Sequence, residues 1–390
     1  MQRLGLGAAF AACVPALWLT LGGGHLTPPV EALWFGFSIF GAAFILSWAA
    51  EAAQMDISQA LATAILALIC VLPEYAVDMY FSYHAAFDPQ YAQYAAANMT
   101  GANRLVIGLA WPGVFLMYFL RSRGKPITLE PGRRNEVVFL WLATLYSFVP
   151  PLFHKSLSLM DTAVFLLIFA GYAWRVSQAQ SHEPELVGPA RLVGSLPQAR
   201  RRLATLGMFL VAGLVIFLSA QRFAEALVHT GRQWGINEFL LVQWFAPLAS
   251  EAPEFIVAFL WASRGDAAAG LGALVSSAVN QWTLLVGMIP LAYSMGLRHA
   301  GALPLDTRQQ HEIILTACQS LCAVAILINL RMSWKGAVVL FGLFATQLFF
   351  EQIRLQVAAV YVVLAIGILI RERRHLGPAF RGVLGRASAS

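Results

Sequence analysis

The stretch LICVLPEYAVDMYFSYHAA, residues 68–86, decides the fold, because it places two acids inside an apolar run long enough to cross a bilayer. Glu74 and Asp78 are four residues apart, so both lie on one face of a helix. A carboxylate at the centre of a membrane costs roughly 2.5–3.5 kcal/mol on insertion scales. Acids in such a position predict a functional site.

The pattern recurs in LASEAPEFIVAFLWASRGDAAAG, residues 248–270. Here Glu251 and Glu254 are three residues apart and again share a helix face. Pro73-Glu74 aligns with Pro253-Glu254 at an offset of about 180 residues. A chain that accepts two buried acids at matched positions is expected to bind a cation.

The composition is that of a polytopic membrane protein. Hydrophobic residues make up 59% of the 390 residues, charged residues 12%, and the mean hydropathy is +0.66. Soluble domains carry about 25% charged residues, so a soluble enzyme and a nucleic-acid-binding protein are both excluded. The sequence also has no G-x-x-x-x-G-K nucleotide motif and no H-E-x-x-H motif, which argues against an ATP-driven pump and an intramembrane enzyme.

Apolar runs of about 17–25 residues are expected to span the membrane as helices. The sequence predicts an all-α protein with about twelve such spans, at 5–23, 29–50, 58–83, 92–120, 136–153, 159–176, 205–228, 237–261, 267–295, 311–330, 334–350 and 355–370. The first run also has the form of a cleaved signal peptide, but a retained helix gives the more consistent topology. The sequence separates the runs at 334–350 and 355–370 less clearly than any other pair of spans.

Most of the 26 basic residues fall in alternate loops, which predicts that both termini are cytoplasmic. The compact loops suggest a prokaryotic plasma membrane by analogy. The predicted organisation is an N-terminal helix at 1–28, a first repeat at 29–176, a cytoplasmic linker at 177–204, a second repeat at 205–350, and an extra C-terminal helix with a basic tail at 351–390. The lipid bilayer and inorganic cations are the expected partners. No nucleic acid and no resident cofactor is expected, and the oligomeric state is left open.

Each acidic stretch is followed by a small-residue helix with buried asparagines. These helices read AAANMTGANRLVIGLAWPG at 95–113 and GLGALVSSAVNQWTLLVGMIP at 270–290. Five helices per half is an odd number, so the second half enters the membrane from the opposite side. The sequence therefore predicts two inverted five-helix repeats, a pattern common in secondary transporters.

The residue types suit a hard cation such as Ca²⁺, which prefers several oxygen ligands. Pro73 and Pro253 are expected to break their helices and free carbonyl oxygens beside the acids. The predicted cation-binding residues are Glu74, Glu254, Glu251, Asp78, Asn98, Asn103, Ser250 and Asn280, with Glu74 and Glu254 as direct metal ligands. The alternatives are structural: the acids could bond neighbouring helices, and the asparagines and Ser250 could serve helix packing.

These stretches resemble the α-repeats of the calcium/cation antiporter superfamily, which includes the sodium/calcium exchangers. Those repeats pair a G-T-S-L-P-E motif with a G-N-V-V-G-S-N motif. Pro73-Glu74 and Pro253-Glu254 match the first motif. Asn98, Gly101 and Asn103 match the second in repeat one, and Asn280 matches its last residue in repeat two. The resemblance implies that Glu74 and Glu254 coordinate the transported Ca²⁺, Na⁺ or H⁺ between crossing helices, by alternating access.

The sequence departs from these motifs at several positions. Cys70 and Val71 stand where repeat one has Thr-Ser, Ser250 and Glu251 stand there in repeat two, and Val275 replaces an asparagine. Loss of hydroxyl ligands disfavours Na⁺ and tilts the expectation toward H⁺ as counter-ion.

Arg104 takes a position that is apolar in the motif. It is expected to pair with Asp78 or Glu251 rather than to bind a substrate anion. The favoured function is a cation antiporter. The alternative is a degenerate exchanger that senses or scaffolds, with Arg104 as a tethered cation.

Overall fold

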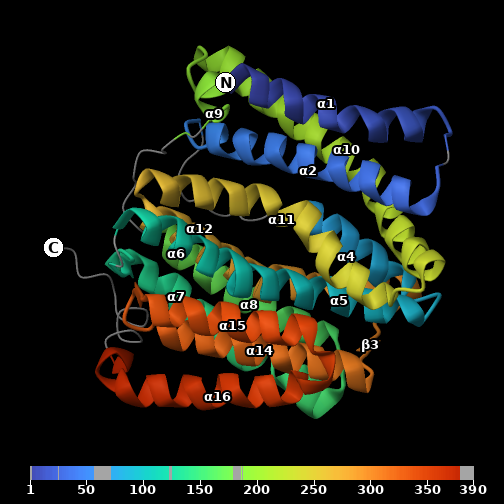
Figure 1. The fold of residues 1–390 in the computed structure, drawn as a ribbon. Coiled ribbons are helices and arrows are strands. Elements are labelled where there is room, and N and C mark those ends of the chain that lie inside the picture. The colour runs from blue at the N-terminus through green and yellow to red at the C-terminus, as the bar shows by residue number, and fades with distance from the viewer. Residues whose placement is uncertain are drawn as a thin grey trace. The chain divides into compact units, whose positions relative to one another are not determined.

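The computed structural model describes residues 2–24, 26–56, 72–122, 125–178, 186 and 188–377. Helices that coincide with the predicted spans occur throughout these ranges (Figure 1). Ten of them are long and apolar enough to cross a membrane, and α15 is a shorter apolar helix. The predicted span at 58–83 is represented by α4 (Leu72–His84), since its earlier residues, Cys70 and Val71 among them, lie outside the described ranges.

The chain divides into two compact units, each built from a piece of both sequence halves. Unit 1 comprises residues 1–98 and 176–253, and unit 2 comprises residues 99–175 and 254–390. The predicted repeats at 29–176 and 205–350 follow the order of the sequence instead, and they remain a prediction.

Unit 1 is built around α2 (Pro28–Ala53), which packs against α1 (Gln2–Leu21) and α10 (Gln198–Trp234) (Figure 1). Small residues allow the close approach: a Cβ on Gly41 would lie 2.6 Å from the Cβ of Ala12. The unit also holds α4, the short α9 (Ala190–Gly194), the first part of α5 (Gln90–Leu105) and the first part of α11 (Glu238–Arg264).

Unit 2 contains the remaining membrane helices. They are α6 (Trp111–Ser122), α7 (Arg134–Tyr146), α8 (Leu159–Ser177, whose last residues fall in unit 1), α12 (Ala267–Asn280), α13 (Val286–Leu297), α14 (Thr307–Leu327), α15 (Trp334–Phe349) and α16 (Arg354–Arg371). Short 3₁₀ turns, η2 (Pro131–Arg133) and η5 (Glu351–Ile353), precede α7 and α16. The turn η5 confirms that 334–350 and 355–370 are two helices.

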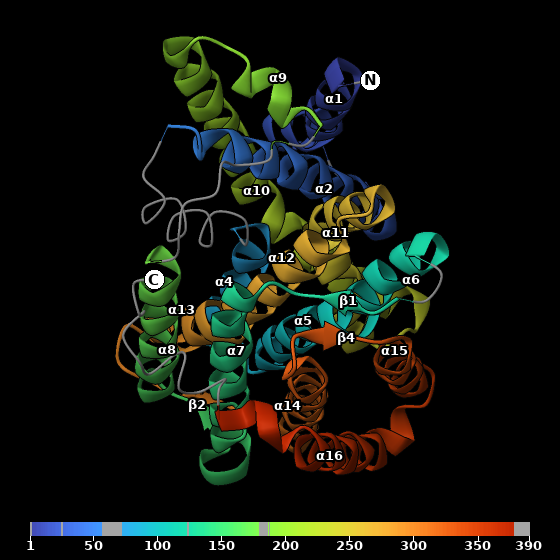
Figure 2. The ribbon, with the colours of Figure 1, turned by 90° about the vertical axis from the view of Figure 1, so that its left-hand side faces the viewer.

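Two short antiparallel ladders tie the loops of unit 2 together. Strand β1 (Ile127–Thr128) pairs with β4 (Arg331–Met332), as Figure 2 shows, and β2 (Ser156–Leu157) pairs with β3 (Leu303–Pro304). The first ladder joins two loops predicted to be cytoplasmic, and the second joins two loops predicted to be external. The loop pairing therefore agrees with the predicted alternation of sides.

Three π-helical segments interrupt the unit 2 helices. The segment η1 (Val106–Ala110) lies between α5 and α6, and η4 (Gln281–Leu285) lies between α12 and α13. The third, η3 (Pro150–His154), follows α7. Because η1 and η4 each come directly after a helix that carries a motif asparagine, they occupy matched positions in the two repeats. Single-turn π segments of this kind are frequent at functional sites.

Candidate functional site

In unit 1, α4 brings Glu74 and Asp78 to one face, one helical turn apart. Both are buried, with 1% and 2% of their surfaces exposed. Asn98 of α5 donates from Nδ2 to Asp78 Oδ1 at 2.8 Å. Among the described residues, Asp78 Oδ2 and Asn98 Oδ1 accept no hydrogen bond. Two buried acceptor oxygens therefore remain beside the first glutamate.

The unit 1 part of α11 supplies Ser250 and Glu251, both buried. Ser250 donates its hydroxyl to the carbonyls of Ala246 and Pro247, at 3.3 and 3.2 Å. A hydroxyl that donates to its own helix keeps its lone pairs for another partner. Ser250 can thus serve as a neutral oxygen ligand.

The helix α11 continues through Pro253, so the predicted break at this proline is wrong. Membrane helices tolerate proline, because neighbouring helices, Ser or Thr side chains and water can satisfy the backbone groups that it frees. The prediction that proline frees a carbonyl oxygen near the acids still holds. Pro253 has no N–H, so the carbonyl of Ala249 has no donor from its own helix. Pro73 lies in the first turn of α4 as described, and the residues before that helix are outside the described ranges.

In unit 2, the second glutamate is held by a serine of the next helix. Ser277 Oγ of α12 donates to Glu254 Oε2 at 2.9 Å. The two helices approach closely at Gly270, where a Cβ would lie 2.6 Å from the carbonyl oxygen of Ala258. Ser277 was part of the quoted motif but not of the predicted ligand set. Ser277 lies about one helical turn before Asn280, and this spacing alone did not identify it as a partner of Glu254.

The two motif asparagines of unit 2, Asn103 and Asn280, lie just before the π segments η1 and η4. Both are buried, and Asn103 donates from Nδ2 to the carbonyl of Met99 at 3.1 Å. Neither Oδ1 atom accepts a hydrogen bond from the described residues. The amide oxygens of both asparagines therefore remain available for a ligand.

Arg104 has a partner that the sequence did not indicate. Its Nη2 lies 2.5 Å from Oε2 of Glu312 on α14, and both side chains are buried. Asp78 and Glu251, the partners expected from the sequence, belong to unit 1, whereas Arg104 and Glu312 belong to unit 2. The acid that neutralises Arg104 could have been suspected, because Glu312 interrupts the predicted span at 311–330.

The described residues hold no group of three or more His, Cys, Asp or Glu side chains placed to bind a metal ion. Amide, hydroxyl and carbonyl oxygens can ligate Ca²⁺ beside carboxylates. Such mixed oxygen sets are usual for Ca²⁺.

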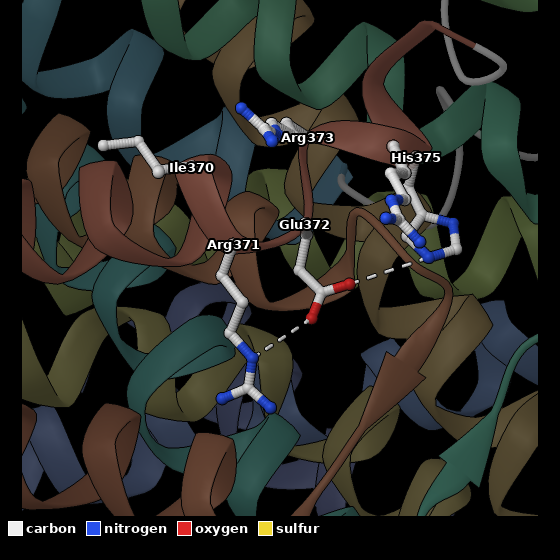
Figure 3. A pocket seen from close by; sticks show the side chains of 6 residues that line it. Ile370, Arg371, Glu372, Arg373 and His375 are labelled. Atoms are coloured by element: carbon white, nitrogen blue, oxygen red, sulfur yellow. Dashed lines mark ion pairs between the residues drawn. The ribbon is translucent and has the colours of Figure 1, made fainter.

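A hollow at the end of α16 contains none of the predicted site residues. Figure 3 shows it lined by Ile370 and the charged side chains that follow, with Glu372 between Arg371 and His375. The two ion pairs are long, at 3.8 and 3.6 Å, and Arg371 and His375 are exposed. These residues give the last membrane helix a basic end, and basic ends of membrane helices are more frequent on the cytoplasmic side.

Comparison with known proteins identifies the family. The model of the family described as "Sodium/calcium exchanger protein" matches residues 30–178 and 204–351. A search of curated proteins gives no match. Among solved structures, the H⁺/Ca²⁺ exchanger CAX is 43% identical with a TM-score of 0.94, over 98% of this chain and 97% of that one.

Two more distant structures share the fold. The Ca²⁺/H⁺ antiporter protein YfkE is 15% identical with a TM-score of 0.64, over 94% of this chain and 99% of that one. The sodium-calcium exchanger NCX_Mj is 17% identical with a TM-score of 0.51, over 90% and 99% of the two chains. The all-α polytopic membrane fold predicted from the sequence is thereby confirmed. Since the family model covers both halves, the chain belongs to the sodium/calcium exchanger family and is a multi-pass integral membrane transporter, not an enzyme.

Proposed function

We propose that this protein exchanges Ca²⁺ for H⁺ by alternating access, with Glu74 and Glu254 as the carboxylates that bind the transported ion. The observation that carries the proposal is a set of buried oxygens that accept no hydrogen bond from the described residues. They are Asp78 Oδ2, Asn98 Oδ1, Asn103 Oδ1 and Asn280 Oδ1. Leaving a buried acceptor unsatisfied costs about 1–3 kcal/mol, and a bound cation would offset that cost.

H⁺ is the counter-ion that the residues favour. The Thr-Ser positions of repeat one are Cys70 and Val71, and Glu251 replaces one of those hydroxyls in repeat two. Hydroxyl ligands for Na⁺ are thus few, whereas a carboxylate can hold either a proton or a divalent cation. A similar chain, 43% identical, is named an H⁺/Ca²⁺ exchanger, which supports the same choice.

The coupling follows from the chemistry of a buried carboxylate. An ionised carboxylate away from water needs a positive partner, and either Ca²⁺ or a proton supplies one. The two ions then compete for the same oxygens, so binding of one releases the other. Ser277 holds Glu254 in place at 2.9 Å, and Asn98 holds Asp78 at 2.8 Å, so the oxygens keep their positions through the exchange.

We favour transport over the sensor alternative. It required Arg104 to act as a tethered cation in place of the transported ion. Within unit 2 the guanidinium is paired with Glu312, an acid outside the predicted site. We also propose that both termini face the cytoplasm of a prokaryotic plasma membrane.

The proposal is tested by ion flux in sealed vesicles that contain the purified protein. An imposed Ca²⁺ gradient should drive proton movement, read with a pH-sensitive dye. The same Ca²⁺ gradient should move little Na⁺. Glu74→Gln and Glu254→Gln should each lower the flux by on the order of 100-fold or more, because a neutral amide cannot exchange a proton for a cation. Exposed Glu130 offers a matched control, and Glu130→Gln should transport normally. Unchanged flux in Glu74→Gln or Glu254→Gln contradicts the proposal.

A further inference from the structure

Arg354, the first residue of α16, is buried where η5 leads into that helix. Its side chain is 9% exposed, and its Nη1 donates to Oε1 of Glu312 on α14. The other two nitrogens, Nε and Nη2, are buried and donate no hydrogen bond to the described residues. Buried donors without an acceptor are costly, so these two nitrogens indicate a place for another partner.

The two unused nitrogens form one edge of the guanidinium group. The N–H of Nε and one N–H of Nη2 point in the same direction, and this fork matches two oxygens of a phosphate or a carboxylate. Because Nη1 is held by Glu312, the direction of the fork is fixed. Arg354 therefore presents a bidentate donor pair that suits an oxyanion.

Glu351 of η5 lies beside the fork without filling it. Its Oε2 is 3.7 Å from Nη2 of Arg354 and 3.7 Å from Nη2 of Arg308, distances that are too long for hydrogen bonds. The Glu351 side chain is 36% exposed, and ion pairs of this length and exposure are weak. It can therefore turn into water when a stronger acceptor arrives. We refer to Arg308, Glu351 and Arg354 as the η5 corner.

The charges around the η5 corner do not balance. Three arginines meet two glutamates, all within unit 2: Arg104, Arg308 and Arg354, with Glu312 and Glu351. In addition, α16 begins without a side-chain cap, so the positive end of its helix dipole lies at this corner. One group of charge −1 would neutralise the excess.

Exposed apolar side chains flank the η5 corner. Phe349 and Phe350, which precede η5, are 76% and 57% exposed, and Leu355 in the first turn of α16 is 46% exposed. The ends of membrane-spanning helices lie near the depth of the lipid headgroups. A phospholipid could place its phosphate on the fork and its acyl chains along these side chains, whereas a free anion would gain nothing from them.

We propose that Arg354 and Arg308 bind the phosphate of an anionic phospholipid at the η5 corner, at the end of unit 2 predicted to be external. Nε and Nη2 of Arg354 donate to two phosphate oxygens, Arg308 adds its charge, and Glu351 turns outward. The bound lipid holds the start of α16 against α14, on which that helix packs. The inference goes beyond ion exchange and is independent of the counter-ion.

The test adds phosphatidylglycerol to the full-length protein, purified without lipid in a neutral detergent, and follows the thermal unfolding midpoint. Phosphatidylglycerol should raise the midpoint of wild type, whereas phosphatidylcholine and inorganic phosphate should raise it much less at the same concentration. Arg354→Lys keeps a positive charge beside Glu312 but has no fork. The lipid concentration that gives half of the stabilisation should therefore rise by on the order of tenfold or more. Arg308→Gln should raise it by about two- to fivefold.

Glu351→Gln gives a readout that a purely structural role does not predict. It removes the negative charge that competes for the fork, so the half-stabilising lipid concentration should fall by about two- to fivefold. Its unfolding without lipid should stay close to wild type. The control is Arg298→Gln, at an exposed arginine in the loop between α13 and β3, and it should respond to lipid as wild type does.

Three outcomes would overturn the proposal. Equal lipid responses in wild type, Arg354→Lys and Glu351→Gln would mean that the lipid acts elsewhere on the protein. Inorganic phosphate as effective as phosphatidylglycerol would rule out a lipid as the ligand, and phosphatidylcholine as effective would rule out selection for an anionic headgroup. If Arg354→Lys is unstable before lipid is added, the opposite shifts expected for Arg308→Gln and Glu351→Gln decide the question.

Discussion

Arg104 and Glu312 stand 208 residues apart in the sequence and form a buried ion pair, with Nη2 2.5 Å from Oε2. The other carboxylate oxygen accepts from Nη1 of Arg354, so one acid holds two guanidinium groups. Gln347 accepts from Arg104 and donates to Gln319 at 2.9 Å, and Gln319 donates to the backbone carbonyl of Arg104 at 3.2 Å. This closed network fixes the end of α5, directly after Asn103, to α14 and α15.

Removing the charge of Glu312 should destabilise the protein strongly. In Glu312→Gln the buried guanidinium groups of Arg104 and Arg354 lose the carboxylate that they share, and breaking a buried pair in this way costs about 3–5 kcal/mol. Thermal unfolding of the purified protein in detergent measures the effect as a lowered midpoint.

A matched control for this substitution lies in η5. Glu351 is 36% exposed and lies 3.7 Å from both Arg308 and Arg354. Because pairs of this length and exposure contribute about 0–1 kcal/mol, Glu351→Gln should unfold close to wild type. Equal midpoints for Glu312→Gln and wild type would show that the network contributes no net stability.

The membrane spans could be predicted from the sequence because their signal is local. An apolar run of bilayer length forms a helix wherever it occurs, so 29–50 became α2 and 159–176 became α8. Buried polar residues inside the spans could be predicted for a related reason, whereas their role as ion ligands remains a prediction. A polar residue inside such a run, as at Glu74 or Asn103, stands out against its neighbours.

Features that depend on contacts between distant helices could not be predicted. The sequence near Asn103 and that near Asn280 contain no signal for η1 and η4, since an extra residue in a helical turn is set by what packs around it. The partner of Arg104 required knowing that α14 lies beside the end of α5. The prediction at Pro253 was wrong because a membrane helix can continue through proline when its surroundings satisfy the freed backbone groups, and those surroundings are set by the fold.

Ser277 should be needed for tight cation binding. Ser277→Ala removes the hydroxyl that orients Glu254 Oε2, and a hydrogen bond to a charged group contributes about 1.5–3 kcal/mol. The affinity for Ca²⁺ should therefore fall by about tenfold or more, measured as the Ca²⁺ concentration that half-stabilises the protein against heat. Thr346 is a fair control, since its exposed hydroxyl bonds only to Gly342 of its own helix among the described residues. Equal Ca²⁺ affinity in Ser277→Ala and wild type would remove Ser277 from the site.

Gly270 should tolerate no side chain. In Gly270→Ala the new Cβ meets the carbonyl oxygen of Ala258 at 2.6 Å, and a backbone atom cannot move aside as a flexible side chain can. Overpacking of this kind costs about 1–3 kcal/mol. It should also separate α12 from α11 and so weaken Ca²⁺ binding at Glu254. Gly207 of α10 provides the comparison, because no described atom lies within 4 Å of the position that a Cβ would take there. Gly207→Ala should be neutral or stabilising, and Gly270→Ala matching it would contradict the close approach.

Asp56 should stabilise the protein by an amount that disappears in acid. The residue follows α2, outside the membrane span, and the hydrogen bonds from Arg201, at 2.7 and 2.9 Å, lower the pKa of its carboxyl to about 2, with Arg202 adding to the effect. The unfolded-state pKa is about 3.9, so the folded state binds this proton more weakly than the unfolded state does. The stabilisation is therefore complete above that value and is lost as the pH falls toward 2.

The comparison that measures this contribution is wild type against Asp56→Asn, followed by thermal unfolding at a series of pH values. Wild type should be the more stable protein near neutral pH, and the gap should close through the acid range between the two pKa values, because a protonated Asp56 resembles the amide. Arg201→Gln should remove most of the gap at every pH, since it takes away the main donor. Arg200→Gln, at the exposed neighbouring residue, should leave the gap as it is in wild type. A gap that stays constant into strong acid would mean that Asp56 stabilises the end of α2 by its shape and hydrogen bonds alone, without its charge.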